Sequence, residues 1–536
     1  MGFFDNKREQ NTEEIRVNTR LGRAITSINS AKEELFEKQP RKDPVPFIEK
    51  AAKENLNFYG FFHTGENKGE PFFLPENETT MEIYVGSTGT GKGVLLGNRA
   101  LEAIKKKKGV IIIDPKTDGF LPQICLEELT RQGRPQDFLV AAWPYNFGYD
   151  GINEEDDYIA VANKLTDAFG WEESDNPGVD YYRKKSRVML KRVLKMFFNG
   201  DLGVIIKKDL NQIAKNIIKL ASDLKKQQDL ETELNKTKPN YDKIEELQKR
   251  YFNTDLLLKQ HWDKQAVDTL ESIAESFGEL IEAGHIYKNF DLKGALYEGK
   301  VLYFRVDMLD ISSLKMIKLM INDAIQQARI KKADTIIIAD ELSFYANQTI
   351  AGALATVRSM GLKFLLALQD LAQMKDEHIR NAILSNCNVK LFYKISDAKT
   401  LEYVEKIGGK ELVTAYSTSA AGESVLTQKQ EEYLNTTRIR ALPRTETAII
   451  VAEALYKPEI VRTNFVAVNK EFDWSKYQHP PKKSIFDNII SKDKDKDDDN
   501  FRFITKAKEA KELIKGSDLL AISFETDEID SVFDDL

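Results

Sequence analysis

The chain has 536 residues, a hydrophobic share of 42% and a formal net charge of −7. Its length exceeds what one core holds and predicts two or three true domains within roughly three or four units. Its two cysteines lie in apolar segments and its five histidines lack ligand spacing, which argues against disulfides and a structural metal, and no apolar window is long enough for a secretory signal or a membrane span.

The N-terminal residues 1–45 predict a charged, weakly amphipathic helix that forms an arm. The prolines of "QPRKDPVP" then end the helix. A nucleotide-binding domain is expected to begin over residues 46–152. There "MEIYVG" predicts a buried strand, "VLLGNRALEAIKKKK" a helix and "GVIIIDPKTDG" a second strand. This order is that of one βαβ unit.

Residues 153–295 change character, with long charged helical patterns and almost no β-branched runs, and predict an inserted all-α domain. Seven basic residues and no acidic residue lie between Arg183 and Lys195, beside an apolar stripe. This pattern fits a phosphate-binding helix face and a solvated helix face equally well.

Strand patterns return over residues 296–470, in "KVLYFRVD", "DTIIIADE", "LKFLLALQD", "VKLFYKIS" and "TAIIVAEAL", separated by helical text. They predict that the same mostly parallel sheet resumes, so the fold class is α/β. Residues 471–536 predict a linker and a flexible acidic C-terminal tail. The last 20 residues hold seven acidic residues and no Lys or Arg. The tail either folds onto a basic partner or keeps the protein soluble.

The stretch "GSTGTGKG" has the spacing of a phosphate-binding loop, with Gly86, four further residues, Gly91 and Lys92. Such a loop curls its backbone N–H groups around a phosphate, the next helix points its positive end at it, and the lysine reaches the β- and γ-phosphates. An incidental glycine turn is the alternative. The predicted ATP-binding residues are Gly86, Ser87, Thr88, Gly89, Thr90, Gly91, Lys92 and Gly93.

Gly93 stands where most such loops have a magnesium-binding Ser or Thr. The strand "TIIIADE" supplies carboxylates instead, and we expect Asp340 to hold Mg²⁺, directly or through water, and Glu341 to orient or deprotonate the attacking water. Gln369, after "KFLLAL", is a candidate for a hydrogen bond to the γ-phosphate or water. Arg358, expected on a helix, is a candidate cation for the phosphate of a neighbouring subunit. A capped strand end, a strand-end polar residue and a surface arginine are the respective alternatives.

In their order, several motifs resemble the coupling proteins of type IV secretion and conjugation, the TraG/TraD group of the FtsK/HerA-like ring ATPases. The resemblance covers about residues 58 to 455 and rests on "GSTGTGKGVLLGN", "VIIIDPKTDG", "WPYNFGYDGIN", "TIIIADE", "VRSMGLKFLLALQDLAQMK", "ILSNCNVKLFYKISDAKTLEYVEKIGG" and "TTRIRALPRTETAII". Many members of this group have glycine after the loop lysine, so the resemblance implies a live site despite Gly93.

The resemblance implies a RecA-like P-loop ATPase that uses ATP and Mg²⁺, assembles as a homo-hexamer, and brings relaxase-bound single-stranded DNA or protein substrates to a secretion channel. The helical insertion is similar to the all-α domain with which the family selects cargo. Such proteins often begin with membrane-spanning helices. None is expected here, so we expect a cytoplasmic protein held at the inner face of the bacterial membrane by a separate membrane partner. A non-motor ATP-binding receptor of the same system and another FtsK/HerA-like DNA translocase are the alternatives.

Overall fold

The computed structural model describes residues 42–116, 118–142, 149–172, 176–202, 205–247, 262–282, 292–418, 424–452 and 457–477. Most of the expected N-terminal arm and nearly all of the linker and acidic tail lie outside the described residues. Among the helices that are described, none combines the length and the apolar character that crossing a membrane requires. The chain divides into two compact units, which are described separately.

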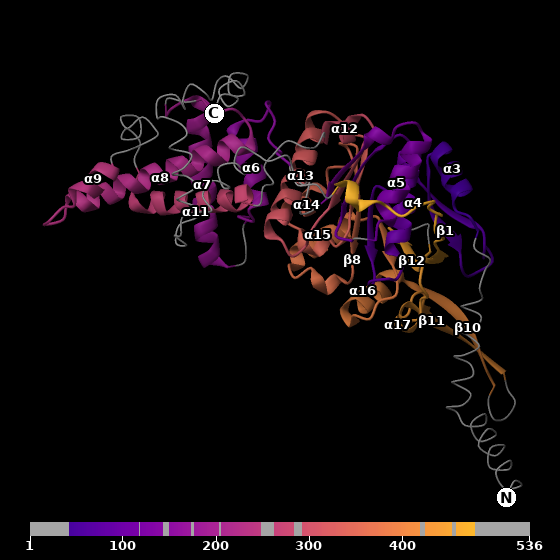
Figure 1. Ribbon diagram of the computed structural model, residues 1–536. Coiled ribbons are helices and arrows are strands. Elements are labelled where there is room, and N and C mark those ends of the chain that lie inside the picture. Colours follow the sequence, from indigo (N-terminus) through magenta and orange to yellow (C-terminus); the bar gives the residue numbers. More distant parts are fainter. Residues whose placement is uncertain are drawn as a thin grey trace, which may run out of the picture. The chain divides into compact units, whose positions relative to one another are not determined.

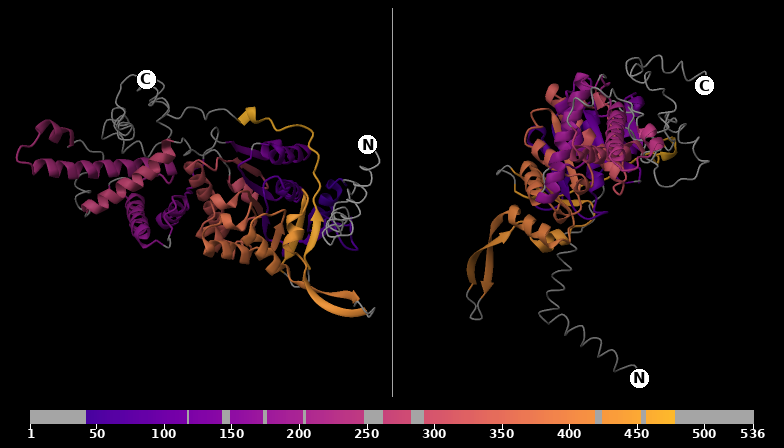
Figure 2. Two further views of the ribbon diagram at one scale, coloured as in Figure 1. Left: turned by 90° about the horizontal axis from the view of Figure 1, so that it is seen from below. Right: turned by 90° about the vertical axis from the view of Figure 1, so that its left-hand side faces the viewer.

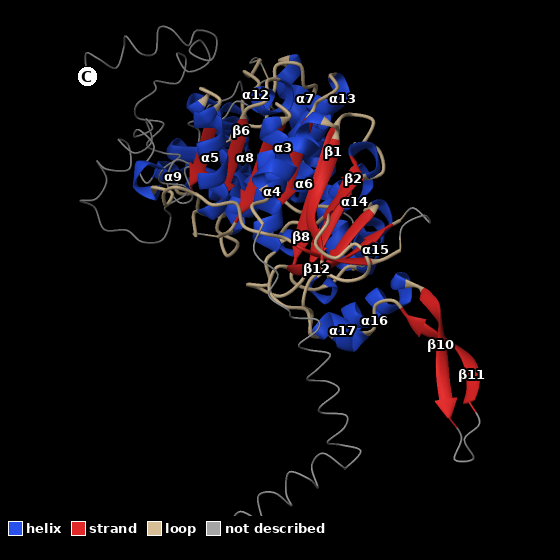
Figure 3. Ribbon diagram, turned by 90° about the vertical axis from the view of Figure 1, so that its right-hand side faces the viewer, coloured by secondary structure: helices blue, strands red, loops and turns tan. Residues whose placement is uncertain are grey.

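Unit 1 comprises Met1–Lys106, Leu365–Lys375 and Leu384–Asn469. Six of its strands lie in the order β2 (Pro71–Pro75), β1 (Leu56–Phe62), β13 (Glu459–Arg462), β12 (Glu446–Val451), β9 (Val389–Phe392) and β3 (Met81–Val85). The β3–β9 pair is parallel, and the other neighbours are antiparallel. Figure 3 shows β1, β2 and β12 in red. The sequence patterns did not distinguish these antiparallel strands from the parallel ones.

Two helices pack within unit 1 near β1, namely α3 (Val45–Lys53) and α4 (Lys92–Lys105) (Figure 1). Helix α3 contacts β1 through Phe47, whose ring lies 5.7 Å from Phe58 and 5.0 Å from Phe61. Strand β3 is buried throughout, as its mostly apolar sequence predicts, and the burial includes Glu82. The strand, loop and helix expected around the glycine loop are therefore confirmed.

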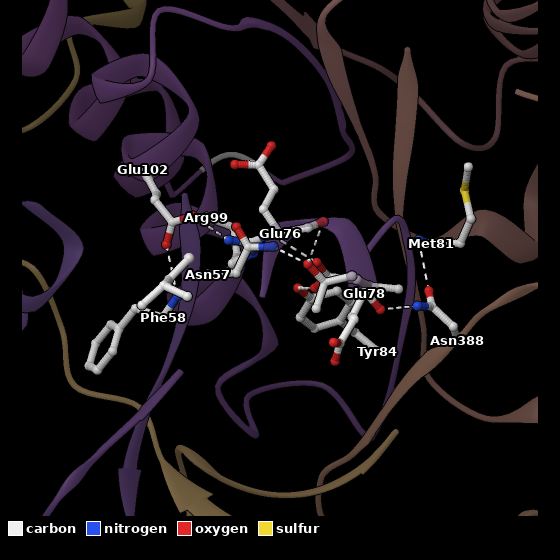
Figure 4. A network of polar contacts seen from close by, with 12 residues as sticks. Asn57, Phe58, Glu76, Glu78, Met81, Tyr84, Arg99, Glu102 and Asn388 are labelled. Atoms are coloured by element: carbon white, nitrogen blue, oxygen red, sulfur yellow. Dashed lines mark hydrogen bonds and ion pairs between the residues drawn. The ribbon is translucent and has the colours of Figure 1, made fainter. Parts of the chain in front are cut away.

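A buried charged network joins α4 to β1 and β3 (Figure 4). Arg99, 1% exposed, donates to Glu82 at 2.9 Å and to Glu102 at 2.6 Å. Glu102 also accepts from the Phe58 amide at 2.9 Å and from Lys106 at 2.8 Å, and the hydroxyl of Tyr84 donates to Glu82. Buried charges are tolerated when they are paired in this way.

Unit 1 also carries an antiparallel ribbon of two strands, β10 (Lys410–Thr418) and β11 (Ser424–Glu432). It runs from the pair Lys410 and Glu432 to the pair Thr418 and Ser424. Helices α16 (Ala398–Gly408) and α17 (Thr436–Arg440) flank it along the chain, and Figure 3 shows the ribbon beyond them.

Unit 2 comprises Lys107–Phe364, Asp376–Ile383 and Lys470–Leu536. Its strands β7 (Thr335–Ala339), β4 (Gly109–Asp114), β6 (Val301–Arg305) and β5 (Phe138–Ala142) lie in this order and are all parallel. Helices α5 (Phe120–Arg131), α12 (Leu292–Tyr297), α13 (Ile311–Ile330) and α14 (Gln348–Ala353) also belong to this unit. Strand β8 (Leu362–Leu368) and helix α15 (Glu377–Asn386) have residues in both units.

Between residues 153 and 291, helices are the only regular secondary structure of the described part of unit 2. It holds α6 (Tyr158–Ala168), α7 (Pro177–Asn199), α8 (Leu210–Leu234), α9 (Tyr241–Leu247) and α11 (Lys264–Glu282), in purple to magenta in Figure 2. Fully buried Lys164 ties α6 to α13, because its ammonium group contacts Asp156 at 2.6 Å and Asp323 at 2.8 Å. The helical content agrees with the sequence patterns, and the domain limits at 153 and 295 stay a prediction.

Candidate nucleotide-binding residues

The glycine loop of unit 1 is held by backbone hydrogen bonds to three neighbouring segments. The amide of Gly86 donates to Leu368 at 3.2 Å, and that of Ser87 donates to Lys394 at 3.1 Å. The amide of Thr445 donates to the carbonyl of Thr90 at 2.8 Å. The loop is thus fixed to the ends of β8 and β9 and to the start of β12.

Gly91 ends the loop in a conformation that only glycine adopts easily, with φ 111°. A Cβ atom at this position would lie 2.8 Å from Cα of Thr445, which itself has φ 71°. Helix α4 begins at the next residue, Lys92. The glycine at this position lets the chain turn from the loop into the helix.

Lys92 and the loop amides have the arrangement that a phosphate group requires. Lys92 is 5% exposed, and its ammonium group donates to the carbonyl of Gly86, back across the loop. Among the described residues, the backbone N–H groups of Thr88, Gly89 and Gly91 have no hydrogen-bond acceptor. Unpaired N–H groups around a lysine, at the N-terminus of a helix, fit the phosphates of a nucleotide.

Gln369 belongs to the same unit as the loop. It directly follows Leu368, whose carbonyl accepts from the Gly86 amide, and its side chain is half-buried. Gln369 is therefore the sequence neighbour of a residue that is hydrogen-bonded to the phosphate loop. Its expected hydrogen bond to a γ-phosphate or water stays a prediction.

Asp340 and Glu341 follow β7 in unit 2, and both are nearly buried. The amide of Asp340 donates to Ile113 at the end of β4, and the hydroxyl of Tyr345 donates to the Asp340 carbonyl at 2.7 Å. Glu341 has φ 51°, in the left-handed region, which costs a residue with a Cβ atom about 1 kcal/mol or more. Strain of this kind clusters at functional sites.

A second carboxylate, Asp114 at the end of β4, lies beside Asp340 and was not singled out from the sequence. Lys116 bridges the two: its ammonium group donates to Asp340, and its amide donates to Asp114 at 2.8 Å. Tyr303 on β6 donates its hydroxyl to Asp114 at 2.6 Å. Burial and the charge of Asp340 raise the pKa of Asp114 to about 7. Although burial opposes it, the two carboxylates raise the pKa of Lys116.

This pair of carboxylates is suited to a divalent cation. Lys116 supplies positive charge at Asp340, and a Mg²⁺ ion bound directly there would take over that role. The described residues contain no group of three or more His, Cys, Asp or Glu side chains suited to a metal. Magnesium in nucleotide sites needs only one or two carboxylates, because phosphates and water supply the other ligands.

The last described residues of unit 2 pack on the same strand as Tyr303. Trp474 lies 6.0 Å from the Tyr303 ring, between centroids, and the guanidinium of Arg305 lies 4.7 Å from the centre of the Trp474 ring. Phe472 contacts Trp474 at 4.7 Å and stacks on Tyr477 at 5.4 Å. We call residues 472–477 the aromatic strap.

Comparison with known proteins places this geometry in context. Residues 335–446, which include β7, Asp340 and the β10–β11 ribbon, match the family model of the TraM recognition site of TraD and TraG. Over 479 residues, the chain is 21% identical to the type 4 coupling protein DotL of Legionella pneumophila subsp. pneumophila, covering 76% of this chain and 60% of DotL. The chain is related to the type IV coupling proteins. It spans less than two thirds of the length of DotL.

Solved structures of another coupling protein, TrwB, share the fold. Unbound TrwBdeltaN70 has a TM-score of 0.54 and 16% identity, over 75% of this chain and 88% of TrwBdeltaN70. TrwB in complex with ADP and Mg²⁺ has a TM-score of 0.53 and 16% identity, over 76% of this chain and 88% of that chain. The expected α/β P-loop NTPase fold of a coupling protein is therefore confirmed.

Among the candidate site residues, Arg358 is one whose expected local structure was wrong. It lies outside α14, in a run of turns, and its side chain is exposed. Its carbonyl accepts from the amide of Gly361 at 3.2 Å, and Gly361 has φ 78°. Helix α14 ends at Ala353, and residues 354–361 form successive turns that lead into β8. The proposed role of Arg358 stays untested.

Proposed function

We propose that this chain is an ATP-dependent coupling protein that hydrolyses ATP and delivers relaxase-bound single-stranded DNA, or protein substrates, to a type IV secretion channel. The relation to DotL and the match to the TraM recognition model support the delivery role. The observation that carries the proposal is the glycine loop, whose unpaired amides directly precede Lys92 at the start of α4. This is a phosphate-binding arrangement.

Each site residue receives a distinct role in this proposal. Lys92 donates to the β- and γ-phosphates, and the amides of the loop bind phosphate oxygens. Asp340 is the Mg²⁺ ligand, Glu341 orients and deprotonates the attacking water, and Gln369 donates to the γ-phosphate. Bound Mg²⁺ supplies positive charge that offsets the charge developing on the phosphates. Convergence of Lys92 with Asp340 on one nucleotide remains a prediction.

Assembly belongs to the same proposal. Arg358, exposed on its turn, would stabilise charge on a nucleotide bound by the next copy of the chain. This role requires a ring, for which we propose a homo-hexamer. A separate membrane partner would hold the ring at the inner face of the bacterial membrane.

Helix α7 is the proposed contact with single-stranded DNA. Lys184 and Lys195 are exposed on it, and Tyr181 and Tyr182 are 51% and 71% exposed. Lys185 lies 4.1 Å from the centre of the Tyr181 ring. Exposed aromatic rings beside basic residues suit the stacking of bases and the binding of the DNA backbone.

The test is ATP hydrolysis by size-resolved protein, with and without single-stranded DNA. We expect DNA to stimulate turnover, Lys92→Ala to abolish ATP binding, and Glu341→Gln to abolish turnover while ATP still binds. Lys53→Ala, at an exposed lysine of α3, is the control and should change neither property. Failure of the unaltered protein to bind ATP would refute the enzyme role. Normal substrate transfer in cells by Glu341→Gln would instead indicate a receptor without motor activity.

A further inference from the structure

A separate cavity lies within unit 2, among α6, α7 and α14. Its volume is about 280 Å³, and its lining residues are Thr166, Asp167, Glu172, Arg187, Gln348 and Thr349. None of these residues belongs to the candidate nucleotide site. The cavity therefore needs an explanation of its own.

Two carboxylates face this cavity without an ion pair. Asp167 accepts from the hydroxyl of Thr349 at 2.7 Å, and Glu172 accepts from the amide of Gln348 at 3.3 Å. Neither carboxylate forms an ion pair with any cation of the described residues. Burial raises the pKa of Asp167 to about 6 and raises that of Glu172, although Lys318 acts in the opposite direction on both. Nearby cations act on the two acidic groups without forming an ion pair with either of them.

A buried hydroxyl group adds an independent observation. Thr166 lines the cavity and is 8% exposed, and its Oγ1 atom has no hydrogen-bond partner among the described residues. Buried polar atoms are rarely left unpaired, so an unpaired hydroxyl on a residue that lines the cavity favours a polar ligand.

The nearby arginines make contacts with the backbone. Arg187 donates to the carbonyl of Trp171 at 3.0 Å, and Arg183 donates to the carbonyl of Glu172 at 3.1 Å. These contacts hold one nitrogen of each guanidinium at the loop between α6 and α7. The carboxylates of Asp167 and Glu172 remain available to a cation from outside.

We propose that this cavity binds a guanidinium group, as a small cation or as an arginine side chain of a partner protein. A guanidinium carries five N–H donors in one plane, which suits two carboxylates and a hydroxyl oxygen on separate elements. The cavity also has room for an arginine side chain. A metal ion fits less well, because no metal-binding group of three or more His, Cys, Asp or Glu occurs among the described residues.

The experiment is calorimetric titration of the full chain with N-acetylarginine methylamide, with the neutral citrulline analogue as the matched ligand. We expect the arginine compound to bind and the citrulline compound to bind at least tenfold more weakly. Guanidinium chloride at millimolar concentration and an arginine-containing peptide distinguish the two sources: tighter binding of the peptide identifies a protein partner, and equal binding identifies a small cation.

Variants locate the binding to this cavity. Asp167→Asn and Thr166→Val should each weaken binding, about tenfold and about threefold, and Glu245→Gln, at an exposed acid of α9, should leave it unchanged. Circular dichroism checks that each variant folds. If Asp167→Asn does not fold, Thr166→Val still tests the cavity, because it replaces only the hydroxyl by a methyl group.

The pH dependence provides a further test of the same binding. From pH 7.5 to 5.5, protonation of Asp167 should weaken binding about fourfold, since its pKa is about 6. Equal binding of the two compounds, or unchanged binding by both variants, would overturn the proposal. ATP binding does not enter these measurements, so the proposal stands or falls separately from the proposed function.

Discussion

Replacing Arg99 by methionine should destabilise helix α4, which begins with Lys92. In the network of Figure 4, Arg99 is the cation between two buried carboxylates, Glu82 at 2.9 Å and Glu102 at 2.6 Å. Without it, Glu102 keeps the Phe58 amide and Lys106 as donors. Glu82 keeps the Tyr84 hydroxyl as a donor, so most of the lost stability should come from the buried charge of Glu82.

The expected magnitude follows from this difference. Removing one partner of a buried ion pair costs about 3–5 kcal/mol, because the remaining charge stays buried and unpaired. A loss of about 3 kcal/mol in the free energy of local opening raises amide exchange rates by roughly a hundredfold. We expect this change in the hydrogen exchange of α4 and β3 at pH 7, with a smaller change in unit 2.

Two variants test the cause of the change. Lys105→Met removes an ion pair to exposed Glu49, and such pairs contribute about 1 kcal/mol or less, so exchange should change less than about fivefold. Adding Glu82→Gln to Arg99→Met removes the unpaired charge and should restore at least half of the lost protection. If Arg99→Met behaves like Lys105→Met, the network does not stabilise α4 and the reasoning is wrong.

Three further predictions concern single residues. Gly91→Ala should weaken ATP binding at least tenfold in a titration, because φ 111° and the 2.8 Å approach to Thr445 strain the loop, whereas Gly133→Ala, in an open turn, should not. Burial raises the pKa of Glu446 to about 7, so its folded form holds a proton that the unfolded form loses near pH 4.5. The free energy of unfolding therefore falls as the pH rises between these values. In urea unfolding, the unaltered protein should lose up to about 3 kcal/mol between pH 4 and pH 8, and Glu446→Gln should not show this loss. Tyr303→Phe removes a donor to Asp114. The thermal midpoint should therefore fall by several degrees above pH 7, where Asp114 is ionised, and by less at pH 5.5. An equal fall at both pH values would contradict this prediction.

The local order around the phosphate loop was predictable because its signals are local. Four apolar residues around Glu82 predicted β3, a glycine loop followed, and helical spacing predicted α4. Runs of β-branched or aromatic residues likewise located β4, β6 and β7. These patterns report burial and period, which the chain carries residue by residue.

The neighbours of these strands were less accessible to sequence reasoning. The sequence showed Asp114 as the end of a strand. Its partner Asp340 is distant along the chain, and Lys116, which donates to Asp340, precedes it by 224 positions. The signal that pointed there was "DPK" directly after a buried strand. Only the pairing of β4 with β7, Ile113 opposite Ala339, brings the two acids together. Strand order is set by packing between segments, and period alone does not contain it.

The helix expected around Arg358 failed for a different reason. Its apolar residues have helical spacing, yet Gly361 lies in the left-handed region and the chain turns into β8. Short segments of this kind are decided by the neighbouring backbone rather than by propensity.

The aromatic strap gives the chain after Tyr477 a fixed point of departure. The stacked rings of Phe472 and Tyr477 anchor the last described residues. Trp474 lies beside Arg305 and Tyr303. Displacement of the strap would therefore disturb Tyr303, whose hydroxyl donates to Asp114. The strap thus links the end of the described chain to the strand that carries a hydrogen-bond donor to Asp114.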